Sequence, residues 1–180
     1  MYLSLEQGTV STRSFKVTRH IGELLVAAAF ALSANSAYSH HSFAMYDSDT
    51  IYNFTGVVTR VNPHPAHLVI QFVPLDEARE KIIRDEDGNP IQWMVELGGT
   101  ATAAREGISV NTFPRGSIIS VGLHPVRDGR GRAGAWHGSG LFKCPPDTPP
   151  APRMHCDSVE GATAHGEGVM AESTAPAPLD

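Results

Sequence analysis

Residues 52–73 read YNFTGVVTRVNPHPAHLVIQFV, two β-strand patterns separated by a proline turn. The first pattern, residues 52–61, is rich in Thr and Val. In the second, residues 67–73, large apolar residues alternate with other types, as on a strand with one buried face. Pro63 and Pro65 end the first strand, because proline cannot donate a hydrogen bond to a β-ladder.

Three further strands and one helix follow this pair. The sequence predicts strands at 91–97, 117–124 and 133–142, and a short alanine-rich helix at 100–106. The order β-β-β-α-β-β is that of the OB-fold, a five-stranded Greek-key barrel. We therefore expect a mainly β fold over residues 40–143, a small five-stranded OB-like barrel with one short helix between strands three and four.

The first 39 residues predict a secretory signal peptide. Basic residues occur at positions 13, 16 and 19, ahead of the apolar stretch 24–32. This stretch is shorter than the roughly 20 apolar residues of a membrane-spanning helix, and it has the length of a signal-peptide core. We therefore expect a periplasmic or secreted protein with no membrane span after cleavage.

Small residues before the predicted cleavage point leave two possible mature N-termini. Ala37 and Ser39 place cleavage just before His40, while Ala34 and Ser36 place it just before Ala37. The first choice makes a histidine the mature N-terminal residue.

The two cysteines fit an exported protein. In an oxidising compartment Cys144 and Cys156 are expected to form a disulfide that closes a proline-rich loop, residues 144–156. Free thiols or a metal-binding pair are the alternative, although the spacing is not the Cys-x-x-Cys of zinc or redox sites. Residues 157–180 have few large apolar side chains and predict a disordered tail.

Charge and motifs exclude several classes of function. The formal net charge of −5 does not indicate a nucleic-acid-binding protein. The sequence has no Gly-x-Ser-x-Gly elbow, P-loop or His-Glu-x-x-His motif. Gly129, Gly131 and Gly134 match the dinucleotide fingerprint only in spacing, because no βαβ unit surrounds them. We therefore expect binding rather than catalysis.

Several short motifs occur in a fixed order along residues 40–142. They are His40-His41-Ser42-Phe43-Ala44, Tyr46-Asp47, Thr55-Gly56-Val57-Val58, Asn62-Pro63-His64, Trp93-x-Val95-Glu96, Arg105-x-Gly107 and His124-Pro125-x-Arg127-Asp128-Gly129. Together they resemble an exported bacterial family, domain of unknown function 6152. The resemblance implies a small exported protein and brings no assigned activity. The chain departs from the family at Pro65-Ala66-His67, at a longer charged insertion before Gly88, and at the cysteine-bearing tail.

Histidines are the candidate metal ligands. If cleavage leaves His40 first, its amino group and imidazole can bind one metal ion together, and a third imidazole would complete a T-shaped set. Nitrogen ligands in this geometry favour Cu(II). The alternative is that these histidines are solvated or structural. The candidates are His40, His41, His64, His67, His124 and His137.

Three arginines in one loop are the candidate anion-binding residues. Arg127, Arg130 and Arg132 precede the last predicted strand, in a loop that OB-like folds use for ligands. A guanidinium can hold a phosphate or carboxylate bidentately, although a solvated loop is the alternative. We therefore expect a domain that binds Cu(II), with a small anion or an envelope protein as the alternative partner.

Overall fold

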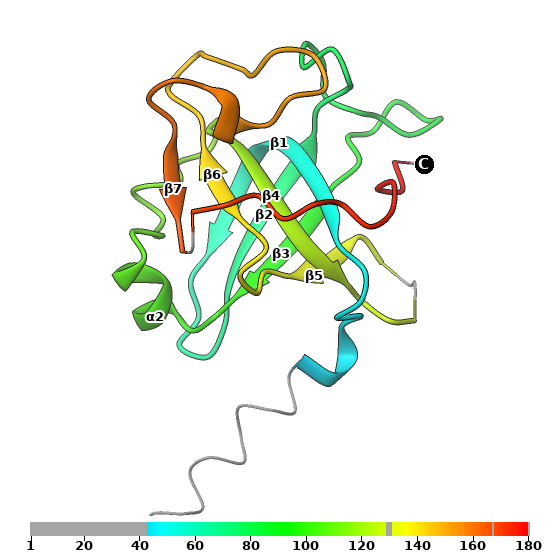
Figure 1. Cartoon of the computed structure of the whole chain (residues 1–180). Helices are drawn as coiled ribbons and strands as arrows, with labels where there is room; N and C mark the ends of the chain where they lie inside the picture. The colour runs from blue at the N-terminus through cyan, green and yellow to red at the C-terminus, as the bar shows by residue number, and fades with distance from the viewer. Residues whose placement is uncertain (1–42, 129–130, 167, 180) are drawn as a thin grey trace, which may run out of the picture. The chain divides into compact units, whose positions relative to one another are not determined.

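The computed structural model describes residues 43–128, 131–166 and 168–179 (Figure 1). This part of the chain is mainly β, with one seven-stranded sheet and one short α-helix. The predicted signal peptide, residues 1–39, lies outside the described residues. The strands are β1 (Tyr52–Asn62), β2 (Leu68–Pro74), β3 (Trp93–Leu97), β4 (Ile118–Pro125), β5 (Ala133–Ala135), β6 (Leu141–Lys143) and β7 (Thr163–His165), and α2 (Thr100–Arg105) lies between β3 and β4.

Strand β1 closes a ring of hydrogen-bonded strands. It pairs antiparallel with β2 on one side and with β4 on the other. Strand β2 continues to β3, β3 pairs in parallel with β5, and β5 pairs with β4. The order round the ring is therefore β1-β2-β3-β5-β4, and β6 and β7 extend the sheet from β4.

Alternating apolar residues of the ring strands form the core. Leu68, Ile70 and Phe72 of β2 are fully buried, as their alternation predicts. The same cluster contains Trp93 of β3 and Phe54 of β1, whose rings lie 4.5 Å apart. Burying a large apolar side chain contributes about 1.5–3 kcal/mol, so this cluster is the main source of stability. Residues at the intervening positions point away from this cluster. Some of them, such as Thr55 and Ser120, are buried by other segments, and others, such as Gln71, are partly exposed.

The predicted strand at 133–142 is two strands in the structure. β5 pairs with β3 and the end of β4, whereas β6 pairs with the middle of β4. Gly138 and Gly140, between them, have φ values of 72° and 94°. A residue with positive φ cannot continue an extended strand, so the two glycines interrupt it.

The structure differs from the predicted disordered tail, residues 157–180. β7 pairs with β6, and the segment after it, drawn red in Figure 1, crosses in front of β4 and β1. There the Ala171 N–H donates to the Ser139 carbonyl at 3.0 Å, and the Thr174 N–H donates to the Ile51 carbonyl at 3.1 Å. Composition does not reveal this arrangement, because backbone hydrogen bonds need no large apolar side chains.

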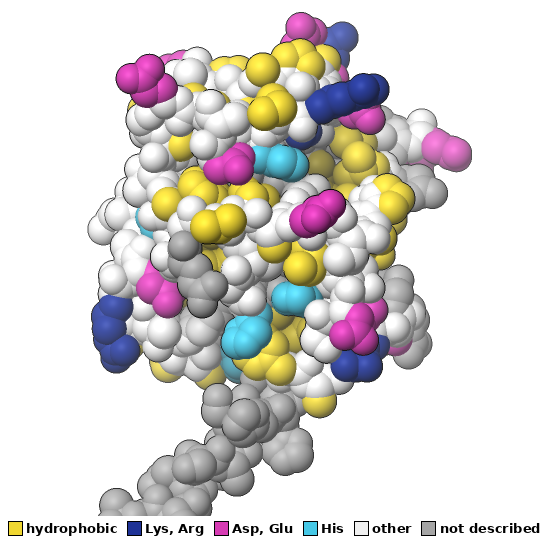
Figure 2. All heavy atoms as spheres, in the orientation of Figure 1, with side chains coloured by type: hydrophobic (Ala, Val, Ile, Leu, Met, Phe, Trp, Pro, Cys, Tyr) yellow, Lys and Arg dark blue, Asp and Glu magenta, His cyan; other side chains and the backbone are white. Residues whose placement is uncertain are grey.

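A disulfide joins Cys144 to Cys156, as the sequence predicts, and both cysteines are buried. It packs with Phe142 in a second, smaller apolar cluster. None of the described helices is long and apolar enough to cross a membrane. The surface in Figure 2 carries acidic and basic side chains interspersed over the same face.

Candidate ligand-binding site

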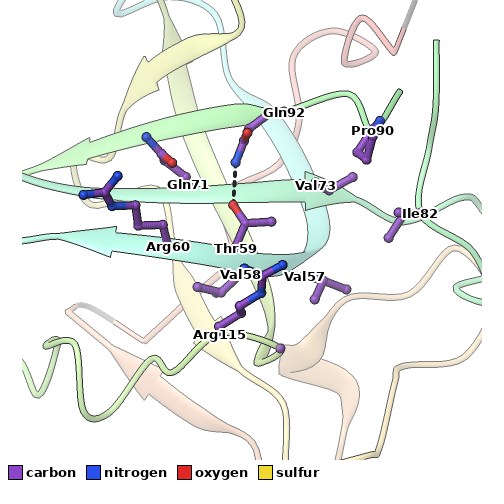
Figure 3. Close-up of a pocket in the computed structure, with 11 residues that line it drawn as sticks. Val57, Val58, Thr59, Arg60, Gln71, Val73, Ile82, Pro90, Gln92 and Arg115 are labelled. Atoms are coloured by element: carbon purple, nitrogen blue, oxygen red, sulfur yellow. Dashed lines mark hydrogen bonds between the residues drawn. The ribbon is translucent and has the colours of Figure 1, made fainter. Parts of the chain in front are cut away.

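A groove of about 470 Å³ opens on the outer face of β1 and β2 (Figure 3). Val57 and Val73 pair with each other across the two strands and line the groove, while their neighbours Val58 and Phe72 belong to the core. Figure 3 shows Arg60 and Gln71 at one end of the groove and Ile82 and Pro90 at the other. The groove therefore has a polar end and an apolar end.

A β-bulge in β1 builds the polar end. The register of β1 against β2 shifts between Val58 and Arg60, so Thr59 is an extra residue on β1. Because Val58 and Val61 both pack against the core, Thr59 and Arg60 both lie on the outer face. Bulges re-aim side chains in this way, often beside functional sites. Thr59 accepts a hydrogen bond from the side-chain amide of Gln92.

The charged groups of the groove are both cations. Arg60 comes from β1, and Arg115 comes from the turn before β4 (Figure 3). The Gly116 N–H donates to the Val58 carbonyl at 2.8 Å, which holds this turn against β1. Among the described residues that line the groove, none carries a carboxylate. The groove is therefore locally positive in a chain of net charge −5.

Two of the predicted metal ligands, His64 and His67, lie beside the β1–β2 connection. The His67 ring nitrogen Nδ1 is 2.8 Å from a carboxylate oxygen of Glu96, whose other oxygen accepts a hydrogen bond from the Tyr46 hydroxyl at 3.0 Å. His64 accepts a hydrogen bond from the Ala66 N–H within its own turn. His64 therefore shapes a turn, and His67 belongs to a polar chain with Glu96 and Tyr46.

The other two described histidine candidates lie on different elements. The His124 Nδ1 is 3.0 Å from the Thr50 carbonyl. The His137 ring packs against Phe43 with 4.6 Å between ring centroids. In the described part of the chain, no three His, Cys, Asp or Glu side chains come together as a metal site. His40 and His41 lie outside the described residues, so the Cu(II) site stays a prediction.

The predicted arginine loop is only partly described. The Arg127 side chain donates to the Tyr46 carbonyl at 2.8 Å, so it fastens the segment before β1 to the end of β4. The Arg132 carbonyl accepts the Met94 N–H at 2.9 Å. Arg130 lies outside the described residues. Neither Arg127 nor Arg132 lines the β1–β2 groove, whose cations are Arg60 and Arg115.

Comparison with known proteins now identifies the family. A family of unknown function, DUF6152, has a model that matches residues 28–135. The chain belongs to this family. No curated protein and no solved structure matches the chain.

Three of the sequence segments that resemble DUF6152, those with Tyr46, Glu96 and Pro125, meet at one place. Tyr46 of the first segment contacts Glu96 of β3, and its neighbour Asp47 donates its N–H to the Pro125 carbonyl at 2.8 Å. Burial and the Glu96 carboxylate raise the pKa of the Tyr46 phenol above its usual value. Hydrogen bonds from the Thr50 hydroxyl and the Asp49 N–H lower the pKa of Asp47. The DUF6152 motifs thus fasten the lead segment across the ring.

The described residues that line the groove all lie within the range that matches DUF6152, residues 28–135. Thr59 and Arg60 follow the Thr55–Val58 motif directly. At the apolar end, Ile82 belongs to the charged stretch that precedes Gly88, and Pro90 follows that stretch. The polar end and the apolar wall therefore both belong to the region that matches the family model.

Sequence reasoning missed a buried polar chain beneath the disulfide loop. The Thr55 hydroxyl is 2.7 Å from the Ser120 hydroxyl and 2.8 Å from the His155 Nδ1, and the Cys156 N–H donates to the Ser120 hydroxyl. Burial, and secondarily the positive charge of Arg79, lower the pKa of His155. Ser120 and His155 are 65 and 100 positions from Thr55 in the sequence, so no local pattern joins the three residues. The buried Thr55 and Ser120 anchor the loop.

Proposed function

We propose that this protein is an exported binding domain that holds a small anion in the β1–β2 groove. One observation carries the proposal. The charged residues in the described lining of the groove are Arg60 and Arg115, with Thr59, Gln71 and Gln92 as neutral polar neighbours and no carboxylate among the described lining residues. The rest of the acidic chain repels anions, so this groove is where an anion is attracted. Each guanidinium offers a planar pair of donors that matches a carboxylate or phosphate.

The proposed architecture is an OB-like barrel formed by the five-strand ring. The helix between the third and fourth strands and the ring order support it. OB-folds bind ligands on the face of their second and third strands. Gln71 lies on β2, and Gln92 immediately precedes β3. The groove therefore includes the face that an OB-like domain would use.

Titration calorimetry at low salt, with inorganic phosphate and with octanoate as probes, tests anion binding. Arg60→Gln and Arg115→Gln are each expected to weaken binding about tenfold, the loss of one charge-assisted hydrogen-bonding group. Arg105→Gln on α2 is the matched control, because it removes the same charge outside the groove. The proposal would be contradicted if the protein bound neither phosphate nor octanoate, or if Arg105→Gln weakened binding as much as Arg60→Gln and Arg115→Gln do.

Export is proposed from the apolar stretch 24–32 and the small residues before His40. The test is the intact mass of the protein recovered from the periplasm or the medium. A mass that begins at His40 or Ala37 is expected. A full-length protein that stays in the cytoplasm would contradict export.

Cu(II) binding by the mature N-terminus is a second candidate, favoured by the cleavage pattern that leaves His40 first. An N-terminal amino group and imidazole suit Cu(II). Native mass spectrometry after addition of one equivalent of Cu(II) is expected to show one retained ion, lost in His40→Ala. A mature chain that starts at Ala37, or one that starts at His40 and remains metal-free, would remove this candidate.

A further inference from the structure

The groove offers two chemically different surfaces within one cavity. Val73 is 4% exposed and Val57 is half-buried, so their side chains form an apolar floor. Ile82 and Pro90 form a wall at the same end, and Arg60 and Gln71 lie at the opposite end (Figure 3). A ligand that fills the groove therefore meets apolar atoms at one end and hydrogen-bond donors at the other.

The apolar wall is held in place before any ligand binds. Leu75 and Ile82 form a β-bridge, and Arg84 bridges to Pro90. At the tip of the segment, the Asp85 carboxylate accepts hydrogen bonds from the N–H groups of Asp87 and Asn89. A segment fixed by its own hydrogen bonds loses little conformational entropy on binding. The wall is therefore suited to receive a ligand rather than to close over one.

The volume and composition of the groove narrow the class of ligand. About 470 Å³ lies within the range of small-molecule sites, roughly 300–1,000 Å³. The described lining includes no aromatic ring and no carboxylate, the groups that would select a cation. An inorganic anion would satisfy the arginines and leave Val73 and Ile82 without a partner.

We propose that the ligand is a free amphipathic monoacid, with its carboxylate at Arg60 and its apolar body against Val57, Val73 and Ile82. Arg115 is a second cation farther along the groove, beside Val57 and Val58 (Figure 3). This inference rests on the proposed anion-binding function and names the ligand class of the same site. The Arg60 guanidinium binds the carboxylate, Arg115 adds to the positive potential of the groove, and the apolar body leaves water.

The test measures affinity for acetate, butyrate, hexanoate and octanoate by calorimetry. Affinity is expected to rise about fourfold per added methylene, the value that corresponds to about 0.8 kcal/mol per buried CH₂. Ile82→Ala is expected to flatten this dependence, so that octanoate loses more affinity than acetate. Val110→Ala, an exposed residue outside the groove, is the matched control.

The outcomes separate this inference from the function on which it rests. Equal affinity along the series, with Arg60→Gln still weakening binding, would overturn the amphipathic ligand and retain the anion site. If the protein bound none of the acids and no phosphate, both the anion site and the amphipathic ligand would be overturned. The protein could also sediment with phosphatidylglycerol vesicles in a way that depends on the groove arginines and yet fail to bind free octanoate. That result would overturn the free acid in favour of a membrane lipid.

Discussion

At the scale of single side chains, Tyr46 joins the segment before β1 to the sheet. It is 5% exposed, and its hydroxyl donates to a Glu96 carboxylate that His67 also contacts. Tyr46→Phe removes this hydrogen bond and is expected to lower the free energy of unfolding by about 1–2 kcal/mol, measured by urea denaturation. Tyr52→Phe is the control, because the Tyr52 hydroxyl has no hydrogen bond to a described residue. Equal losses in both variants would contradict the role of the Tyr46 contact.

Protonation of His155 is expected to destabilise the fold. Its pKa is lowered in the folded state by burial and by Arg79, so the unfolded chain binds the proton more readily. The stabilising contribution is fully present above the ordinary pKa of 6.5 and is lost as pH falls through the folded pKa. The urea concentration at the unfolding midpoint is measured at pH 7.5, 6.5 and 5.5. As pH falls, it should decrease more steeply for the natural protein than for His155→Asn. The exposed His64→Asn is the control, and parallel profiles for natural protein and His155→Asn would refute the prediction.

Single positions could be predicted from the sequence where the strand period decides them. Leu68, Ile70 and Phe72 are buried because alternate residues of a strand share a face. The contact of His67 with Glu96 could not be predicted in this way, because it depends on the register of β2 with β3. The place of Arg60 in the groove could not be predicted either, since a bulge one residue away decides which face of the sheet Arg60 occupies.

At the scale of elements, Gly56 allows β1 and β2 to approach closely. A Cβ at this position would lie 2.7 Å from the Val73 carbonyl oxygen and 2.8 Å from the Phe72 ring. Gly56→Ala is therefore expected to cost about 1–3 kcal/mol in unfolding free energy, as overpacking does. Gly98→Ala, whose Cβ would meet side-chain atoms no closer than 3.5 Å, is the control. The idea fails if Gly56→Ala unfolds at the same denaturant concentration as the natural protein.

The disulfide loop is expected to stabilise the sheet through the chain entropy of the unfolded state. Cys144 and Cys156 close a loop of separation 12, worth about 3 kcal/mol in the chain-entropy model. The Cys144→Ala/Cys156→Ala double variant should lose about this amount in guanidinium unfolding. Reduction of the natural protein should produce a similar loss, and an unchanged midpoint in both experiments would contradict the assignment.

Strands were predictable where a long apolar alternation specifies them, and less so where short pairings do. The predicted strands at 52–61 and 67–73 agree with β1 and β2 within one residue. The split of the last predicted strand depends on two positive-φ glycines, and β7 depends on pairing with a distant partner. Three-residue strands contain too little pattern to be distinguished from loops.

At the scale of the whole molecule, the net charge and the groove charge have opposite signs. Anion binding in the groove is therefore expected to weaken as salt increases, because salt screens the guanidinium groups. Calorimetry with octanoate in 20 mM and 500 mM NaCl, about 20 and 4 Å in Debye length, measures this effect. An affinity for octanoate that does not change with salt would show that the apolar end alone binds it. The double variant Arg60→Gln/Arg115→Gln is the reference, because it lacks the guanidinium groups that salt screens.

Ring closure also affects how the protein meets other copies of itself. Each of the six strands β1 to β6 pairs with neighbours on both sides, and among the described strands β7 alone has a single partner. An unpaired strand edge is a template for aggregation and amyloid growth. The edge of β7 is three residues long, Thr163–His165, and is bounded by Gly166 at positive φ. A concentrated solution of the folded protein therefore has little backbone on which a fibril could begin.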